Sequence, residues 1–248
     1  MSKHNKKLHN ASEPHYLRSN PILFCTPAQA RTLLSEGRCL LMFVRHGLTD
    51  WNMQMRLQGR ENVPLNDEGK IQADEIAYVL KTALEGKNVN GVYTSPLSRA
   101  KDTAAFIASR FGYDKAEIID DLIERDYSSL SGLTLAERKE RFPSAKDYPA
   151  DIESSPDAAL RMKKVALQLC FDGDATSGVT IAVTHGGVIN SLFSHLTRGR
   201  AGVGKNVAKN CTISMCASGM FDIIPLAFNL QGEDFINYVN EIKENEKN

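Results

Sequence analysis

Two runs of hydrophobic residues stand out along the chain. Residues 39–44, CLLMFV, and residues 178–184, GVTIAVT, are apolar at most successive positions and do not alternate with polar ones. A strand that is covered on both faces shows this pattern, whereas a strand with one wet face alternates. The sequence therefore predicts two buried strands, at 39–44 and 178–184.

A spacing of three to four residues marks the predicted helices. In residues 67–84, one stripe of an amphipathic helix contains Ile71, Ile76, Val79, Leu80 and Ala83. Residues 26–36 also predict a short helix, because Thr26 can act as its N-cap and Pro27 suits its first turn. Further helices are predicted at 96–111, 133–142, 156–171 and 187–196, with short strands at 88–95 and 118–119 and a hairpin at 212–226 that turns at Ser218 and Gly219.

The alternation of strands and helices predicts an α/β fold, a three-layer sandwich with a mostly parallel central sheet flanked by helices. Residues 1–38 are interpreted as an N-terminal extension, partly disordered because residues 1–20 are polar, with one short helix. Residues 39–248 are expected to form one domain.

Composition narrows the class of partner. Thirty basic residues balance thirty acidic ones, so no overall field favours a nucleic acid or an anionic membrane. Five scattered cysteines without a CxxC pattern indicate a reducing compartment, and no apolar run approaches the roughly 18 residues of a membrane span. We therefore expect a cytoplasmic protein that binds neither nucleic acid nor membrane; the oligomeric state is not predicted.

The two long hydrophobic runs end in the same way. His46-Gly47 follows the first and His185-Gly186 follows the second. Ligands of open α/β sheets bind beyond the carboxyl ends of strands, so the two histidines would meet if these strands are neighbours. Adjacent strand residues point to opposite faces, so Arg45 can join His46 in one site only if the strand ends there.

Two arginines and a glutamate complete the candidate site. Arg99 lies after a predicted strand, in the first turn of a helix, and guanidinium groups bind tetrahedral oxyanions bidentately. Arg45 adjoins His46, and Glu124 lies in a loop where it could be an acid–base group. Two arginines and two histidines around one pocket fit a phosphate group.

At this point a family resemblance becomes specific. The motifs RHGLTDWN, RLQGRENVPLNDEGKIQA, SPLSRAKDTA, LIERDYSSLSGLT and VTHGGVI, in this order, resemble the histidine phosphatase superfamily, the phosphoglycerate-mutase-like enzymes, over roughly residues 40–220. The resemblance implies that His46 is a nucleophile that forms a phosphohistidine. It implies that Arg45, Arg99 and His185 hold the phosphoryl oxygens, assisted by Asn52, and that Glu124 is the proton donor.

No metal or cofactor is implied, and the expected partner is a small phosphorylated substrate. Gln58 and Gly59 either contact this substrate or form a turn. The substrate-binding residues expected from the resemblance are Arg45, Asn52, Gln58, Gly59, Arg99, Glu124, Tyr127 and Gly186.

The branch of the family stays open at this level. Gly187 and Val188 follow the second histidine pair as in phosphatases, and residues 134–155 do not match the lysine and paired arginines that mutases carry there. These features favour a phosphomonoesterase, with a phosphoglycerate mutase as the alternative. A catalytically silent module that binds phosphorylated ligands and a zinc hydrolase using His46, His185 and Glu124 are the remaining hypotheses.

Overall fold

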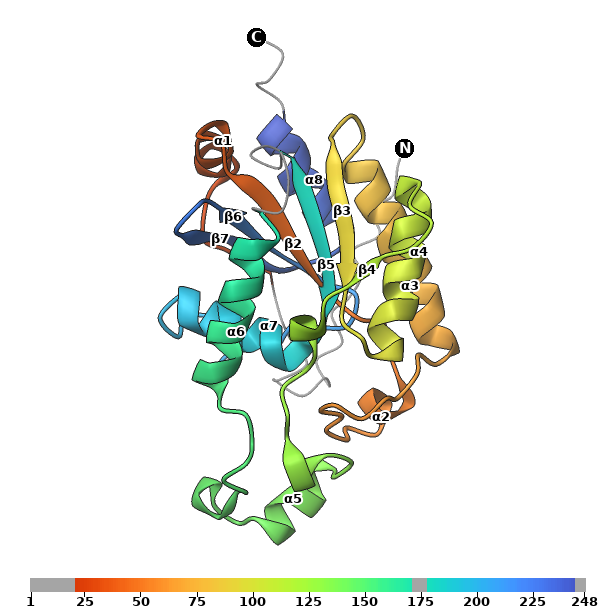
Figure 1. Cartoon of the computed structure of the whole chain (residues 1–248), viewed down its shortest axis with the longest axis vertical. Helices are drawn as coiled ribbons and strands as arrows, with labels where there is room; N and C mark the ends of the chain where they lie inside the picture. The colour runs from red at the N-terminus through yellow and green to blue at the C-terminus, as the bar shows by residue number, and fades with distance from the viewer. Residues whose placement is uncertain (1–20, 171–177, 244–248) are drawn as a thin grey trace, which may run out of the picture.

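A mixed sheet of seven strands forms the centre of the computed structural model, which describes residues 21–170 and 178–243 (Figure 1). The strand order is β1-β7-β6-β2-β5-β3-β4. The strands are β1 (Ile22–Leu23), β2 (Cys39–Arg45), β3 (Val89–Thr94), β4 (Glu117–Ile118), β5 (Val179–Thr184), β6 (Ile213–Ser218) and β7 (Ile223–Leu230).

The α/β fold is as predicted, but the sheet is less parallel than expected. Strands β2, β5, β3 and β4 are parallel to one another, whereas β6, β7 and β1 pair antiparallel. The reason is the position of the β6–β7 hairpin. The hairpin itself is confirmed, and its tight turn makes β7 antiparallel to β6. Strand β6 enters the sheet at the edge where β2 ends, with Ile213 opposite Val44, and so runs antiparallel to β2.

Helices cover both faces of the sheet, which gives the predicted three layers. Helices α1, α3, α4 and α8 pack with alternate residues of β2, such as Met42, on one face. Helices α6 and α7 pack with the others, such as Phe43, on the opposite face. The helices are α1 (Pro27–Ser35), α2 (Asp50–Met53), α3 (Asp67–Ala83), α4 (Ser98–Phe111), α5 (Leu135–Arg141), α6 (Ser155–Gln168), α7 (Gly186–Leu196) and α8 (Gly232–Lys243), with short 3-10 turns η2 (Asp120–Leu122), η3 (Ser128–Leu130) and η4 (Ala145–Asp147).

Local signals account for several helix ends. Thr26 caps α1 in a reciprocal capping box with Gln29, and Pro27 occupies the first turn, as predicted. Helix α4 ends at Gly112, whose φ of 80° lies in the left-handed region that favours glycine. Helix α2 and helix α8 were not predicted. The latter buries Phe235, Tyr238, Val239 and Ile242, the i, i+3, i+4, i+7 positions of an amphipathic helix.

The residues just before position 39 join the same sheet. Strand β1 pairs antiparallel with β7, and α1 packs against α8. The part of the expected extension that is described, residues 21–38, thus lies against the rest of the domain. The expected disorder of residues 1–20 concerns a segment outside the described residues.

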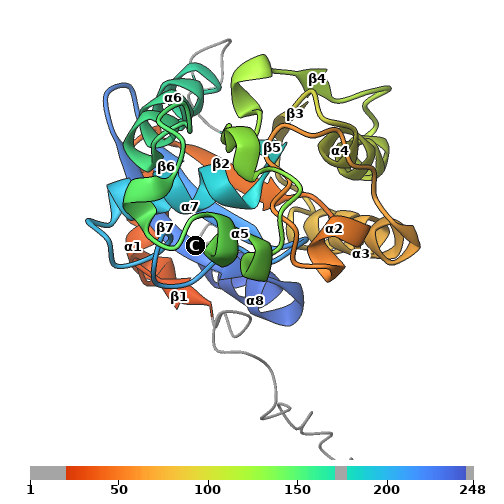
Figure 2. The same cartoon turned by 90° about the horizontal axis from the view of Figure 1, so that it is seen from below.

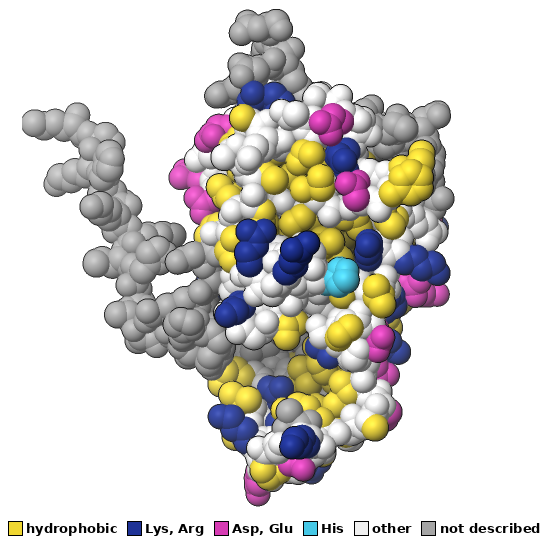
Figure 3. Space-filling view, turned by 90° about the vertical axis from the view of Figure 1, so that its left-hand side faces the viewer, with side chains coloured by type: hydrophobic (Ala, Val, Ile, Leu, Met, Phe, Trp, Pro, Cys, Tyr) yellow, Lys and Arg dark blue, Asp and Glu magenta, His cyan; other side chains and the backbone are white. Residues whose placement is uncertain are grey.

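The carboxyl ends of the parallel strands mark the functional end of the molecule. Arg45 lies opposite Thr184 in the register of β2 and β5, so both strands finish at one edge of the sheet. Figure 2 views this edge, with α2 and α5 beyond it and α7 beginning there. Within the described residues, no helix is long and apolar enough to cross a membrane. The face in Figure 3 carries side chains of both charges, in line with the balanced composition.

Candidate active site

The two predicted histidines lie side by side at this edge. Strand β2 ends at Arg45, which meets the condition set by the alternation of strand residues, and His46 follows it. The rings of His46 and His185 have centroids 5.2 Å apart and an interplanar angle of 58°. Both side chains are almost fully buried. The pairing of β2 with β5 is therefore what brings together two residues 139 positions apart.

The hydrogen bonds of His46 define its tautomer. Its Nε2 lies 3.3 Å from Nε of Arg99, which can only donate, so Nε2 must accept. Its Nδ1 lies 2.7 Å from the carbonyl oxygen of Gly47, which can only accept, so Nδ1 carries the proton. Burial and the charges of Arg99 and Arg45 lower the pKa of His46 well below its usual value. The imidazole is thus neutral, with the lone pair of Nε2 directed into the site.

Most of the buried polar side-chain atoms that lack a partner, among the described residues, belong to residues of the site. Across the described residues, the buried side-chain atoms without a protein partner are Nε of Arg45, Oε1 of Gln58, Oγ of Ser98 and Nδ1 of His185. Three of them belong to residues predicted for the site, and Ser98 precedes Arg99. Because native proteins pair nearly all buried polar atoms, this concentration indicates a place for a polar ligand.

The partner of His185 suggests which of its atoms donates. Nε2 of His185 lies 2.7 Å from Oγ of Ser95, and that oxygen also accepts the backbone N–H of Leu97. Oγ of Ser95 is therefore well placed to donate its own proton to Nε2, which leaves the ring proton on Nδ1. Burial and the charge of Arg99 lower the pKa of His185, so this ring is also neutral. Its Nδ1–H is then a buried donor without a partner.

The two arginines differ in how many of their N–H groups already donate to protein acceptors. Arg45 donates from Nη1 to the carbonyl oxygen of Ala208 at 2.7 Å and leaves its Nε unpartnered. Arg99 is fully buried, and burial lowers its pKa to about 10, so it stays charged at neutral pH. Its Nη1 and Nη2 donate to the carbonyl oxygens of Glu61 and Gly59. Three of its five N–H groups thus already donate hydrogen bonds. The sequence suggested a guanidinium free to bind an oxyanion with two N–H groups, whereas Arg99 holds a loop beside His46.

Glu124 is held at the N-terminus of α7. Its Oε1 accepts the N–H groups of Arg125 at 2.8 Å and Val188 at 3.0 Å, and its Oε2 accepts the N–H of Gly187 at 2.9 Å. The positive end of a helix is a favourable place for a carboxylate. A Cβ atom on Gly187 would overlap the hydroxyl of Tyr127 and lie 2.5 Å from Oε1 of Glu124. Glycine at this position is therefore needed for the approach of the glutamate.

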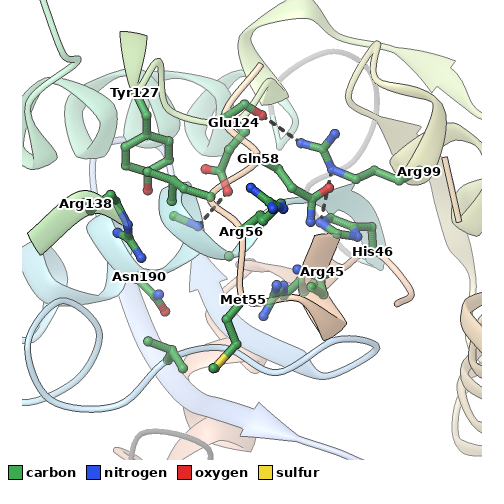
Figure 4. Close-up of a pocket in the computed structure, with 16 residues that line it drawn as sticks. Arg45, His46, Met55, Arg56, Gln58, Arg99, Glu124, Tyr127, Arg138 and Asn190 are labelled. Carbon is green, nitrogen blue, oxygen red and sulfur yellow. Dashed lines mark hydrogen bonds between the residues drawn. The ribbon is translucent and has the colours of Figure 1, made fainter. Parts of the chain in front are cut away.

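The remaining predicted residues surround one cavity of about 260 Å³ (Figure 4). Oδ1 of Asn52 accepts from the N–H and the hydroxyl of Thr49, so its NH₂ group is left as a donor. Gly59 has a φ of 53° and a carbonyl oxygen bound to Arg99, so it does form a turn while lining the cavity. Burial raises the pKa of Tyr127, which keeps its hydroxyl protonated. His185 is the one predicted residue that does not line the cavity. The predicted residues that line it are Arg45, His46, Asn52, Gln58, Gly59, Arg99, Glu124, Tyr127 and Gly186.

Sequence reasoning missed two polar contributors. Nδ2 of Asn210 lies 2.9 Å from the carbonyl oxygen of His46, 3.1 Å from that of Gly47 and 3.2 Å from Oδ1 of Asn52. Arg138, from α5, lines the cavity on the side away from His46 (Figure 4). Asn210 comes just before β6, so its place follows from the antiparallel pairing of β6 with β2, which the sequence pattern does not reveal.

Comparison with known proteins places the chain in a family. Residues 41–218 match the histidine phosphatase superfamily (branch 1), and the chain belongs to this superfamily. It is 33% identical to the uncharacterized phosphatase PhoE of Bacillus subtilis, over 63% of this chain and 76% of that protein. It is 34% identical to the metal-independent phosphoserine phosphatase of Arabidopsis thaliana, over 64% and 68% of the two chains.

Mutases and solved structures are also similar. A 2,3-bisphosphoglycerate-dependent phosphoglycerate mutase of Methylocella silvestris is 29% identical, over 64% of this chain and 82% of that protein. The structure of mycobacterial glucosyl-3-phosphoglycerate phosphatase in complex with VO3 matches with a TM-score of 0.68 at 24% identity, over 78% of this chain and 100% of the other. This likeness confirms the fold.

Over residues 21–170 and 178–243, no group of three or more His, Cys, Asp or Glu side chains is arranged to hold a metal ion. The cationic side chains that line the cavity are all arginines: Arg45, Arg56, Arg99 and Arg138.

Proposed function

We propose that the chain is a phosphomonoesterase that hydrolyses a small phosphorylated metabolite through a phosphohistidine on His46. The observation that carries this proposal is the neutral His46 ring, with its proton held on Nδ1 by Gly47 and its Nε2 accepting from Nε of Arg99 at the wall of the cavity. A neutral imidazole is the nucleophilic form, and it divides hydrolysis into two easier displacements.

In the first displacement, Nε2 of His46 attacks phosphorus and the bond from phosphorus to the ester oxygen breaks. Arg45, Arg99 and Nδ1–H of His185 stabilise the charge on the phosphoryl oxygens, and each such donor contributes on the order of 2–4 kcal/mol. Glu124, in its protonated form, gives its proton to the departing alkoxide. Oε1 already accepts two N–H groups and Oε2 accepts one, so Oε2 is the oxygen with capacity to exchange the proton.

In the second displacement, water attacks the phosphohistidine in line. The Glu124 carboxylate takes a proton from this water, the bond between phosphorus and Nε2 breaks, and inorganic phosphate leaves. His46 returns to its neutral form and Glu124 to its protonated form, so the cycle closes without any other reactant. We assign Asn52, Gln58, Gly59, Tyr127 and Gly186 to substrate binding because they line the same cavity. The names of two similar proteins, a phosphoserine phosphatase and a glucosyl-3-phosphoglycerate phosphatase, support a small phosphorylated substrate.

The test is to trap the intermediate. Rapid quenching during turnover of p-nitrophenyl phosphate, followed by mass spectrometry, should show one phosphoryl group on the peptide that contains His46. The variant His46→Asn should show neither the adduct nor turnover. His195→Asn changes an exposed histidine on α7 and should retain both. An adduct on another residue, or full turnover by His46→Asn, would exclude the proposal.

The alternative, supported by the similarity to phosphoglycerate mutases, differs in the acceptor of the phosphoryl group. A mutase returns it to a hydroxyl of the substrate. Incubation with 3-phosphoglycerate separates the two: a phosphatase releases inorganic phosphate, whereas a mutase forms 2-phosphoglycerate with little phosphate. We also infer a cytoplasmic location, which the five unpaired cysteines support.

A further inference from the structure

A second cavity, the amino-end cavity, lies at the opposite end of the sheet from the candidate active site. It is found where β2 and β5 begin, between α1, the end of α3 and the last turns of α8. Figure 1 shows α1 and α8 near the top of the view and α2 and α5 near the bottom. The amino-end cavity has a volume of about 340 Å³, within the usual range of ligand pockets, roughly 300–1,000 Å³. It shares no lining residue with the cavity beside His46.

The walls of the amino-end cavity are apolar. Leu40 and Val179 lie opposite each other in the register of β2 and β5, while Leu84 comes from the end of α3 and Val239 and Ile242 come from α8. All five side chains are buried and belong to the larger hydrophobic cluster of the core. An apolar group that entered the cavity would therefore be removed from water, which contributes roughly 25 cal/mol per Å² of apolar surface.

The charged residues around these walls all have the same sign. The ones that line the cavity are Arg31, Arg38, Lys87 and Lys243. Each is half-buried, and no carboxylate of the described residues lines the cavity, although the chain as a whole has as many acidic as basic residues. Arg38 is paired with Asp222 and Glu36 outside the cavity, so its charge is largely offset.

Arg31 and Lys243 are held without such compensation. Nε of Arg31 donates to the carbonyl oxygen of Ile242 at 2.9 Å, and Nζ of Lys243 donates to that of Ala83 at 3.0 Å. These oxygens belong to the ends of α8 and α3 and carry only the partial charge of a helix terminus. Nη1 of Arg31 donates to no acceptor in the described part of the chain. Both cations are thus fixed at the cavity with positive charge to spare.

We propose that the amino-end cavity binds a small amphiphilic anion, an aliphatic or aromatic carboxylate whose apolar body fills the cavity and whose charged group meets Arg31 and Lys243. Apolar walls disfavour a polar metabolite, because its hydroxyl groups would lose water without gaining a partner. The two cations favour a carboxylate over a neutral molecule of the same shape, because a hydrogen bond between charged groups is the stronger one. This site is separate from the candidate active site and does not depend on the proposed phosphatase chemistry.

Calorimetric titration of the full chain tests the proposal. Octanoate and 2-naphthoate are the anionic probes, and octanamide and 2-naphthamide are their neutral counterparts of nearly the same shape. One carboxylate should bind per chain, about 10- to 100-fold more tightly than its amide, and should raise the temperature of unfolding. The titration is repeated in saturating inorganic phosphate, which competes only for the arginines beside His46. Carboxylate binding that phosphate abolishes would belong to that site and overturn the inference.

Variants locate the bound anion. Arg31→Gln and Lys243→Gln should each weaken octanoate binding about 10-fold and leave octanamide binding unchanged. Val239→Phe should fill the cavity and abolish binding of both probes, with p-nitrophenyl phosphate turnover at the level of the wild type. Lys164→Gln, which removes an exposed lysine of α6 outside the cavity, is the matched control and should bind as the wild type does.

The remaining outcomes distinguish other occupants of the cavity. Equal affinity for octanoate and octanamide would make it an apolar cavity without charge selection and overturn the inference. The same holds if neither charge variant weakens octanoate binding, a result that can be read even if Val239→Phe does not fold. Absence of binding together with a dimer in sedimentation that Val239→Phe dissociates would assign the cavity to a second copy of the chain and would likewise overturn it.

Discussion

Replacing Glu124 with glutamine separates proton transfer from the rest of the chemistry. Glutamine has nearly the same shape, but it has one acceptor oxygen and an NH₂ group that only donates. The carboxylate now accepts from Arg125, Val188 and Gly187, so an amide in its place leaves at least one of these N–H groups without an acceptor. An unsatisfied buried group costs about 1–3 kcal/mol, and we expect the free energy of unfolding to fall by about that amount.

The catalytic effect should depend on the leaving group. General acid catalysis contributes roughly 10²- to 10⁴-fold, which corresponds to about 3–5 kcal/mol of barrier. An alkoxide such as that of β-glycerol phosphate needs the proton, so its kcat/KM should fall in Glu124→Gln by this factor. A nitrophenolate leaves without a proton, so kcat/KM for p-nitrophenyl phosphate should fall far less. Breakdown of the phosphohistidine still needs a base, so a burst of nitrophenol should precede slow turnover.

Stopped-flow measurement of nitrophenol, steady-state phosphate release and chemical denaturation together provide the assay. Asp121→Asn is the matched control, because it neutralises an exposed carboxylate three residues earlier and should change none of the three readouts. The reasoning fails if Glu124→Gln slows both esters by the same factor without a burst. Such a result would mean that Glu124 stabilises the transition state or the fold and transfers no proton.

Two further predictions concern residues around the nucleophile. Asn210→Ala removes the amide that holds the carbonyl oxygens of His46 and Gly47. Because the nucleophile would be displaced, kcat should fall about 10- to 100-fold for aryl and alkyl esters alike. A leaving-group dependence like that of Glu124→Gln would argue against this positioning role. The pKa values of His46 and His185 are lowered in the folded state, so stability should be fully present above about pH 6.5 and decrease as the pH falls below it. Denaturation of the wild type and His185→Asn at pH 7.5 and 5.5, without phosphate, should show a smaller loss of stability in the variant. Equal losses would contradict a neutral buried His185.

The sequence was most informative where chemistry follows directly from a strand end. His46 and His185 each come after a run of apolar residues, so their place at one edge of the sheet required only that two strands be neighbours. Arg138 could not be found in this way. It lies on a short, mostly exposed helix whose position over the cavity depends on the path of a long irregular segment. The hydrogen bonds of Arg99 could not be predicted either, because its acceptors are main-chain oxygens of Gly59 and Glu61, and a main-chain acceptor leaves no pattern in the side chains of a sequence.

The contacts of Arg99 connect substrate binding to activation of the nucleophile. Its Nε–H donates to Nε2 of His46, the atom that attacks phosphorus in the proposed mechanism, so this hydrogen bond occupies the lone pair. Nη1 and Nη2 are held by the loop carbonyls, so the guanidinium cannot follow His46. In the proposed mechanism, an arriving phosphoryl oxygen competes for the Nε–H and is the stronger acceptor, because it is charged. The same hydrogen bond that anchors the substrate then frees the lone pair, at the moment when phosphorus is within reach.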